Sequence, residues 1–319
     1  MDIDISIVIV SYNVKEYLRN CLETIFQHSG SLNVEAIVVD NHSEDGSAEM
    51  IRKEFASVKL IPNNQNNGFS KANNQGIRES RGRYILLLNP DTLLWERTLS
   101  TTYDYMEKHP EVGCVGIKTY TASGSVFPNG SSFPAAWKVM GKFLMVKQVL
   151  PNRWIRKYFP TSIGRLLSFY ASRDVERQVD MVGGFFMFVR REIIETVGLM
   201  DEGYFLEIED SDWCMRMKKR GWKVMYIPHA SFTHLIGKSI DRYRFSKSTF
   251  VNELTNTMRF YRKFYRPINL FVLKMAILAG ILFQTVFTLL ATLFVGRERI
   301  QFGEKMSAFY LMTKRVFTF

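Results

Sequence analysis

One short segment, residues 205–216, holds four carboxylates within six positions and places apolar side chains between them. The acids are Glu207, Glu209, Asp210 and Asp212, and their neighbours are Phe205, Leu206, Ile208 and Trp213. Carboxylates beside apolar groups have shifted pKa values, and such groups serve as acids and bases in catalysis. The alternative is a solvated helix start, where acids favour the positive end of the dipole. Taken alone, the segment favours neither interpretation.

Polar residues also follow three predicted strands. They are Ser11, Tyr12 and Asn13, then Asp40 and Asn41, then Asn89 and Asp91. In open α/β sheets the carboxyl ends of the strands hold the ligand. Turn formation is the alternative use of these residue types. Three such clusters on one edge favour a site.

The elements that must position these residues alternate along the chain. Aliphatic runs typical of buried strands predict strands at 5–10, 34–39, 58–61 and 84–88. Apolar residues at helical spacing predict helices over 17–26, 48–55 and 71–80. The crossover lengths fit right-handed βαβ units. The first hundred residues therefore predict half of a doubly wound α/β sheet.

Composition narrows the classes of partner. The 319 residues carry a net charge of +11, which favours nucleic acid, phosphorylated ligands or an acidic membrane surface. The three cysteines, Cys21, Cys114 and Cys214, match no zinc spacing and no disulfide framework, which predicts a reducing compartment. The first residues lack the basic start and apolar run of a signal peptide.

Two later regions differ from the predicted sheet. Residues 134–177 interleave basic and aromatic side chains, which indicates single-stranded nucleic acid, anionic lipid or a solvated basic helical insertion. Residues 275–295 contain no charge and are long enough to span about 30 Å of hydrocarbon. A buried helix is the alternative. The denser basic flank precedes this segment, so the positive-inside rule places the main domain in the cytoplasm, and residues 302–319 are expected to lie flat on a membrane.

The polar clusters belong to an ordered set of motifs. They are Ser11-Tyr12-Asn13, Val39-Asp40-Asn41, Asn67-Gly68-Phe69, Ala72-Asn73-Asn74, Leu88-Asn89-Pro90-Asp91, Gly183-Gly184, Glu209-Asp210 and His234-x-x-Gly237-x-Ser239. Over residues 4–265 this set resembles the inverting family 2 glycosyltransferases of the GT-A fold, and most of all the bacterial branch with rhamnosyltransferases.

The resemblance implies an α/β GT-A fold. Its doubly wound mixed sheet would have a Rossmann-like nucleotide-binding half, and C-terminal membrane-associated helices would follow. The expected domains are 1–266, with a nucleotide-sugar half over 1–115 and an acceptor half over 116–266, and a membrane segment over 267–319.

The resemblance also implies a nucleotide-diphosphate sugar as donor. Tyr12 is expected to pack on the base, and Asp40 to accept from a base N–H or a ribose hydroxyl. Gly68 would let the backbone approach the nucleotide, and Asn74 would brace that loop or bind the ligand. Ser11, Asn13, Asn67, Asn89 and Asp91 complete the expected donor site.

A divalent cation, Mg²⁺ or Mn²⁺, is expected against the diphosphate, where it acts as a Lewis acid. Asp91 matches the last acid of the family's Asp-x-Asp motif. The first position is Asn89, which offers an oxygen without a charge. His234 matches a family position that completes the coordination shell, and His229 is the second candidate.

The expected general base is Asp210, which would take the proton of the attacking acceptor hydroxyl. Glu209 would orient Asp210 or contact the acceptor, and Glu209 as base is the alternative. Gly183, Gly184 and Trp213 are expected on the acceptor side. Asp212 is expected to cap a helix that begins near Trp213.

An acceptor carried on a lipid diphosphate would explain the basic and apolar C-terminal part. We therefore expect a lipid-linked saccharide acceptor, a membrane surface and the cytoplasmic face of the bacterial inner membrane. The first choice of donor is dTDP-rhamnose, and UDP-hexoses and UDP-N-acetylhexosamines are alternatives. A basic membrane- or nucleic-acid-binding protein without catalysis is the rival class. Because acids beside a phosphate path repel it, no nucleic acid is expected.

Overall fold

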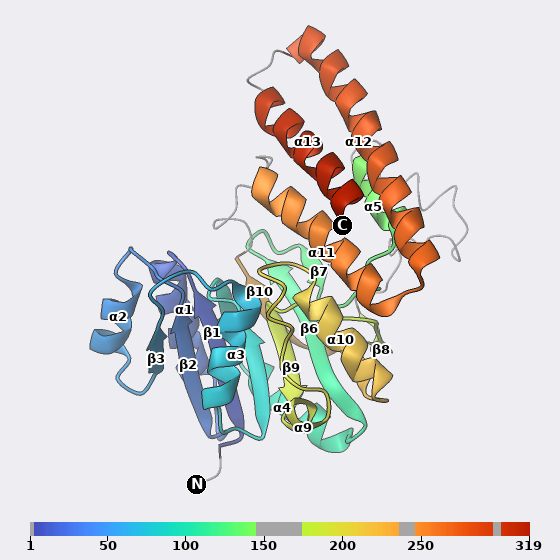
Figure 1. Cartoon of the computed structure of the whole chain (residues 1–319). Coiled ribbons are helices and arrows are strands. Elements are labelled where there is room, and N and C mark those ends of the chain that lie inside the picture. Colours follow the sequence, from blue (N-terminus) through green and yellow to red (C-terminus); the bar gives the residue numbers. More distant parts are fainter. Residues whose placement is uncertain (1–2, 145–173, 236–245, 296–300) are drawn as a thin grey trace. The chain divides into compact units, whose positions relative to one another are not determined.

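The chain forms two compact units in a computed structural model that describes residues 3–144, 174–235, 246–295 and 301–319 (Figure 1). Unit 1 combines Met1–Ser132 with Ser172–Ile240, and unit 2 combines Phe133–Ala171 with Asp241–Phe319. Most of the predicted basic insertion at 134–177, and the motif residues Gly237 and Ser239, lie outside the described residues. The predicted boundary at residue 266, between a sugar-transfer domain and a membrane segment, stays a prediction.

Unit 1 is built on one mixed sheet, ten-stranded over the described residues, in the order β3-β2-β1-β4-β9-β6-β10-β5. Two short strands lie beside this path, where β7 pairs with β6 and β8 with β10. The strands are β1 (Ile5–Ser11), β2 (Val34–Asp40), β3 (Lys59–Pro62), β4 (Tyr84–Leu88), β5 (Thr92–Leu94), β6 (Val112–Thr121), β7 (Val126–Pro128), β8 (Arg177–Gln178), β9 (Phe186–Arg190) and β10 (Lys223–His234).

The first four strands of the order are mutually parallel, as the aliphatic runs predict. β9 then enters antiparallel to both β4 and β6, and β10 runs parallel to β6. The register aligns Ser11 with Asp40 at the carboxyl ends of β1 and β2. At the far edge, His234 pairs with Thr92 of the antiparallel strand β5. The pairing therefore brings the end of β10 beside Asp91.

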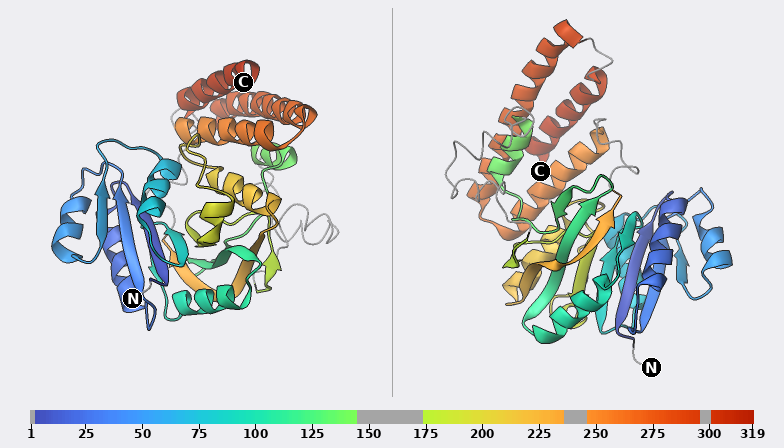
Figure 2. Two further views of the ribbon diagram at one scale, coloured as in Figure 1. Left: turned by 60° about the horizontal axis from the view of Figure 1, so that its bottom comes forward. Right: turned by 180° about the vertical axis from the view of Figure 1, so that it is seen from behind.

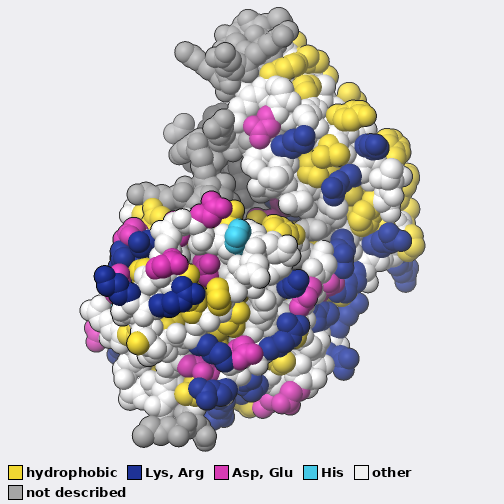
Figure 3. Space-filling view, turned by 60° about the vertical axis from the view of Figure 1, so that its left-hand side comes forward, with side chains coloured by type: hydrophobic (Ala, Val, Ile, Leu, Met, Phe, Trp, Pro, Cys, Tyr) yellow, Lys and Arg dark blue, Asp and Glu magenta, His cyan; other side chains and the backbone are white. Residues whose placement is uncertain are grey.

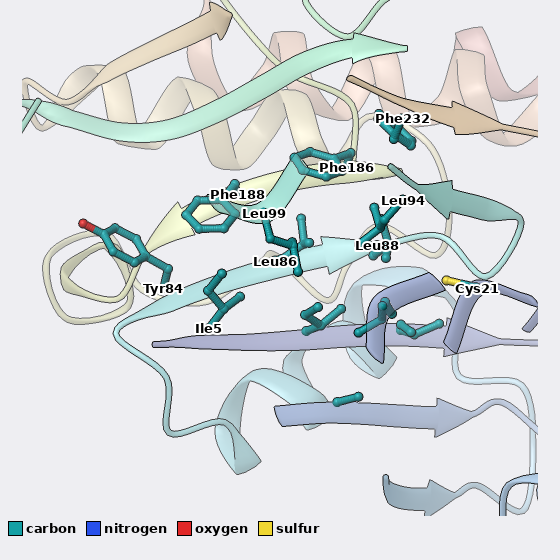
Figure 4. Packing of buried hydrophobic residues seen from close by; sticks show 14 of the residues in the cluster. Ile5, Cys21, Tyr84, Leu86, Leu88, Leu94, Leu99, Phe186, Phe188 and Phe232 are labelled. Atoms are coloured by element: carbon teal, nitrogen blue, oxygen red, sulfur yellow. The ribbon is translucent and has the colours of Figure 1, made fainter. Parts of the chain in front are cut away.

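Helices cover both faces of this sheet. They are α1 (Lys15–Gln27), α2 (Ser47–Glu54), α3 (Phe69–Glu79), α4 (Thr98–Lys108), α9 (Glu192–Thr196) and α10 (Glu209–Lys219). On one face, α1, α2 and α4 bury an aliphatic and aromatic core that includes Ile5, Tyr84 and Phe186 (Figure 4). On the other face α3 lies so close to the sheet that a Cβ at Gly76 would overlap Val8. The predicted helices and strands of the first hundred residues are confirmed within two or three residues.

Unit 2 is helical in its described parts. Its helices are α5 (Ala136–Phe143), α11 (Lys247–Phe264), α12 (Pro267–Val295) and α13 (Phe302–Thr318), which lie side by side in both views of Figure 2. The amide of Lys247 donates to Glu304 over 3.1 Å, and the guanidinium of Arg315 donates to Thr255 over 3.2 Å. α13 therefore runs parallel to α11, and α12 connects the end of one to the start of the other.

The apolar C-terminal helix begins earlier than the charge-free window at 275–295 indicates. Within α12, Pro267–Leu290 is long and apolar enough to cross a membrane, with a mean hydropathy of 2.1. Lys274 lies inside this helix. A lysine does not end a helix, because its aliphatic stem packs along apolar surface while the ammonium reaches a polar boundary.

Candidate active site

Asp91 and His234 form the first half of the site. His234 Nε2 lies 3.0 Å from Asp91 Oδ1, and both side chains are buried. Asp91 also accepts through its backbone carbonyl from the amide of Leu235, over 2.8 Å. His234 Nδ1 is buried and has no hydrogen-bond partner among the residues that the structure describes. The structure thus brings together the two residues expected to hold a cation, which are 143 positions apart in the chain.

Two residues outside the sequence motifs, Thr92 and Cys21, hold the turn that carries Asp91. Thr92 Oγ1 donates to the carbonyl of Asn89 over 2.8 Å, and Cys21 Sγ lies 3.4 Å from the same hydroxyl. Burial raises the pKa of the Cys21 thiol to about 12, so it stays neutral. Asn89 itself is half-buried, and its amide donates to the carbonyl of Phe185 over 3.1 Å.

Gly184 and Phe185 connect this pair to the predicted base. The Phe185 ring stacks on the His234 ring, with centroids 4.9 Å apart and planes 21° apart. The backbone amide of the adjacent Gly184 lies near the carboxylate of Asp210 and lowers its pKa. A single dipeptide thus touches the Asp91–His234 pair with its ring and Asp210 with its backbone. Asp91 and Asp210 are 119 positions apart in the chain, and this dipeptide lies beside both of them.

Asp210 and Glu209 occupy the first turn of α10. Burial raises the pKa of Asp210, and hydrogen bonds from the amides of Ser211 and Gly184 oppose the rise. Burial together with the negative charge of Asp210 raises the pKa of Glu209 well above its usual value. Glu209 Oε2 is buried, and no described residue forms a hydrogen bond with it. Raised pKa values suit the pair to accept and release protons in catalysis.

The backbone immediately before these acids is strained. Glu207 and Ile208 have φ of 72° and 76°, a left-handed conformation that costs a non-glycine residue about 1–3 kcal/mol. α10 begins at Glu209 and has no side-chain cap. The expected capping role of Asp212 is wrong, because the helix starts before it. Asp212 is instead fully buried and accepts from Arg216 Nε over 2.7 Å and from Tyr204 over 3.3 Å.

Two expected ligand contacts take a different form. A Cβ at Gly68, whose φ is 78°, would lie 2.6 Å from the Phe205 carbonyl, so this glycine admits residue 205, and its approach to the nucleotide stays a prediction. Trp213 is fully buried, and its indole donates to the carbonyl of Gly198 over 2.8 Å. Because it has no exposed surface, Trp213 cannot touch an acceptor here. We assign it a positioning role under the first turn of α10.

The structure keeps Gly183 and Gly184 on the Asp210 side. The amide of Gly183 donates to the buried side chain of Asn129 over 2.6 Å, and a Cβ at Gly184 would lie 2.9 Å from Phe69. Asn129 in turn donates to the carbonyl of Phe186 over 2.5 Å. Asn129 was missed by sequence reasoning because a single asparagine outside a motif carries no signal. It holds the glycine pair in place.

The opposite end of the site is formed by the ends of β1 and β2. Asp40 Oδ2 accepts from the Ser43 amide over 3.1 Å, while its Oδ1 and Ser11 Oγ are buried without partners. Tyr12 is half exposed. Asn13 has a φ of 53° and accepts from the Glu44 amide over 2.7 Å, so it holds the loop after β2. Free acceptors beside an exposed aromatic ring suit a nucleoside.

The remaining donor-site candidates are held within the protein. Both ends of the Asn74 amide are occupied, since it donates to Met200 and Glu202 and accepts from the Met200 amide over 3.0 Å. Asn74 therefore braces the segment before Phe205. The backbone amide of Asn67 donates to the side-chain oxygen of Asn41 over 3.0 Å. Asn41 also bonds Asn63, Asn66 and Gly68, which makes it the centre of the loop before α3.

We expect Gly68→Ala to destabilise the protein through two effects. The positive φ costs alanine about 1 kcal/mol, and the overlap of its Cβ with Phe205 costs a further 1–3 kcal/mol. Gly124→Ala is the matched control, because its φ is 76° and a Cβ there meets nothing within 4 Å. The free energy of unfolding of the two variants, measured in urea, separates strain from overlap. Equal losses would show that Phe205 does not press on Gly68.

The raised pKa of Asp210 also predicts a pH dependence. A base must be ionised, so the rate should fall as pH drops through the raised pKa, above the ordinary value of 3.8. The measurement is kcat against pH, with circular dichroism at each pH to exclude acid unfolding. A rate that stays constant down to pH 3.8 would contradict a carboxylate of raised pKa as base.

A cation site must be judged from the donor set. Within the described ranges, no group of three or more His, Cys, Asp or Glu side chains could hold a metal ion. The available donors are the Asp91 carboxylate and the His234 imidazole. They fit Mg²⁺ or Mn²⁺ at a substrate site, because such ions take one or two protein ligands together with phosphate oxygens and water. His229, the second candidate, pairs with Glu176 over 3.1 Å instead.

Sequence comparison identifies the class of protein. The profile of glycosyl transferase family 2 matches residues 6–198, more than half of the chain. The chain belongs to glycosyl transferase family 2 and is a glycosyltransferase. The match ends before Glu209, Asp210 and His234, so the roles of these residues depend on their geometry.

Two curated relatives carry informative names. The N-acetylglucosaminyl-diphospho-decaprenol L-rhamnosyltransferase of Mycobacterium tuberculosis is 25% identical over 240 residues, which cover 72% of this chain and 75% of that protein. The dTDP-rhamnosyl transferase RfbF of Shigella flexneri is also 25% identical over 240 residues, covering 74% and 71%. Rhamnosyltransferases are therefore among the relatives of this chain.

Solved structures confirm the predicted GT-A fold. GalNAc-T7 with UDP, GalNAc and Mn²⁺ is similar with a TM-score of 0.58 and 15% identity, over 82% of this chain and 48% of that one. The mannosyltransferase PcManGT from Pyrobaculum calidifontis, with GDP-Man and Mn²⁺, has a TM-score of 0.55 and 14% identity, over 98% and 88%. At such identities the likeness concerns the fold alone.

Proposed function

We propose that this glycosyltransferase moves a sugar from a nucleoside diphosphate to a lipid-linked saccharide, with inversion at the anomeric carbon. The observation that carries the proposal is the Gly184-Phe185 dipeptide, which contacts the Asp91–His234 pair with its ring and Asp210 with its amide. A cation-binding pair beside a carboxylate base is what displacement of a diphosphate by an alcohol requires.

The nucleoside end of the donor is assigned to Ser11, Tyr12 and Asp40. The free Asp40 Oδ1 can accept from the imino N–H of a pyrimidine base or from a ribose hydroxyl, and the exposed Tyr12 ring can pack on the base. dTDP-rhamnose is the first choice of donor, supported by the names of the two relatives. UDP-hexoses and UDP-N-acetylhexosamines are the alternatives.

The diphosphate is assigned to Asp91, His234 and Asn89. When bound, a divalent cation would neutralise the charge that develops on the leaving diphosphate. Asp91 and His234 would hold this cation, and Asn89 can add a neutral oxygen or an N–H donor. The turn below them, fixed by Thr92 and Cys21, keeps the Asp91 carboxylate in position.

We assign the role of general base to Asp210. As the acceptor oxygen forms its bond to the anomeric carbon, the bond from that carbon to the diphosphate oxygen breaks, and Asp210 takes the hydroxyl proton. The attack comes from the side opposite the leaving group, so the configuration inverts. Glu209, whose raised pKa favours its protonated form, can donate a hydrogen bond to the acceptor through its free oxygen. We assign Gly183 and Gly184 to the acceptor side, beside Asp210.

A lipid-linked acceptor is supported by the name of the mycobacterial relative and by the apolar helix α12. Such an acceptor presents its diphosphate at a membrane surface, where basic side chains attract it. We therefore place the protein at the cytoplasmic face of the bacterial inner membrane.

A donor screen tests this function. Thermal unfolding is measured with dTDP-rhamnose, UDP-hexoses and UDP-N-acetylhexosamines, each with Mn²⁺ or with chelator. The correct donor at one hundred times its Kd should stabilise the protein by about 2.7 kcal/mol. This stabilisation should shrink in Asp40→Asn and vanish with chelator. No stabilisation by any nucleotide sugar would contradict the proposal.

A further inference from the structure

The net positive charge of the chain comes from unit 2. Its two segments, Phe133–Ala171 and Asp241–Phe319, hold 20 Lys and Arg against 4 Asp and Glu, a formal charge of +16. The rest holds 22 against 27, a charge of −5, and together they give the +11 of the chain. A body so basic is attracted to anionic surfaces. The sugar-transfer unit itself is acidic overall.

One side of α12 is apolar and uncovered along the whole length that can be described. From Ile268 to Leu290, large apolar side chains at helical spacing are between 40% and 67% exposed. The opposite side, with Leu273, Ile277 and Ile281, is buried against the other helices of unit 2. Figure 3 shows hydrophobic side chains gathered on the C-terminal helices with basic ones beside them. An apolar stripe of this extent marks a lipid or protein contact.

A basic cluster adjoins the start of this stripe. Because α13 runs parallel to α11, the ends of both helices and the start of α12 meet, and the Arg262 guanidinium lies 5.6 Å from the centre of the Phe319 ring. Exposed cations at this end are Arg262, Lys263, Arg266, Lys314 and Arg315. Apolar side chains that continue into a cluster of cations complement a bilayer with anionic headgroups.

The packing at the middle of α12 opposes a crossing of the bilayer. Gly280 lies against Phe143 of α5, and Gln284 Nε2 donates to the Phe143 carbonyl. The same short helix carries Lys142, which forms an ion pair with Glu253 of α11. If α12 crossed, its midpoint would bring these charges to the hydrocarbon centre, where each costs about 2.5–3.5 kcal/mol or more. A helix lying in the interface keeps them on the aqueous side.

We infer that α12 lies in the plane of an anionic bilayer, with its stripe among the acyl chains and the basic cluster at the phosphates, and that it does not cross. This inference rests on the proposed membrane association but not on the proposed transfer reaction. A lipid-binding assay without sugar nucleotide therefore separates failure of one from failure of the other. A protein partner for the stripe becomes an outcome of the test.

The first experiment is flotation of the full chain with vesicles of phosphatidylcholine, with and without phosphatidylglycerol. We expect binding to the anionic vesicles that weakens in salt and falls at least tenfold in the double variant Val272→Glu, Val286→Glu. Val175→Glu in unit 1, with an exposure of 56% against 50% and 49%, is the matched control and should float like the wild type. Equal binding by the double variant, or no flotation of the wild type, would overturn the inference.

The second experiment distinguishes lying from crossing. Single cysteines at Ile268→Cys and Leu290→Cys are reacted with a membrane-impermeant maleimide in spheroplasts, since the three native cysteines are buried. A helix in the plane of the cytoplasmic leaflet predicts no labelling of either site in intact spheroplasts and labelling of both once detergent has dissolved the bilayer. Labelling of one site from outside would establish a crossing helix and overturn the inference.

Discussion

Asp210→Asn is expected to lower kcat by about 10³-fold or more while leaving donor binding within twofold of the wild type. The amide keeps the shape of the side chain but cannot accept the acceptor's proton, and a positioned base contributes 10²–10⁴-fold on its own. Transfer is measured by release of nucleoside diphosphate, and donor binding by calorimetry with Mn²⁺. A uniform loss of both would point to misfolding rather than to a missing base.

Two further variants sharpen this result. Asp104→Asn, an exposed aspartate on α4, is the matched control and should leave kcat unchanged. Glu209→Gln tests the alternative base, and we expect a smaller loss than for Asp210→Asn, because Glu209 retains its proton more strongly. Substantial turnover by Asp210→Asn together with an inactive Glu209→Gln would transfer the role of base to Glu209.

Removal of the Asp91 carboxylate is expected to abolish metal-dependent donor binding. Asp91→Ala takes away the carboxylate of the pair, and a loss of several kcal/mol corresponds to about 10²–10³-fold in kcat/KM. His234→Ala should weaken Mn²⁺-dependent binding of the donor in the same direction but less, because the carboxylate remains. The measurement is calorimetric donor binding over a series of Mn²⁺ concentrations.

His229→Ala is the control for His234→Ala. This second histidine is exposed and pairs with Glu176, so its loss should leave donor binding unchanged. If donor binding by Asp91→Ala is unchanged with and without chelator, the metal role of the pair is wrong. If His229→Ala is affected and His234→Ala is not, the histidine ligand has been misassigned.

The parallel half of the sheet was predictable because its strands are buried on both faces. Runs such as residues 84–88 contain no polar residue, and only a covered sheet accommodates them. The second half was less predictable. β9 inserts antiparallel between β4 and β6, and no local pattern in an apolar run records the direction of its neighbours.

The sequence motifs predicted which residues belong to the site, but they did not predict the contacts that tertiary packing creates. The residue types at Asp91 and His234 fit a cation, but their meeting depends on β10 pairing with a three-residue strand. A glycine at position 68 indicates an unusual backbone conformation or a close contact, but the sequence does not indicate that Phe205 is the residue in contact. Trp213 was expected on the surface of the site and lies beneath it, because an indole can satisfy its single donor on a buried carbonyl.

The configuration of the product tests the central claim most directly. Proton NMR of the glycoside formed from the preferred donor, recorded early in the reaction, distinguishes the two anomers. One base at Asp210, facing a diphosphate held by Asp91 and His234, predicts a product whose anomeric configuration is opposite to that of the donor. A product with the donor's configuration would require a covalent glycosyl intermediate and would contradict direct displacement at this site.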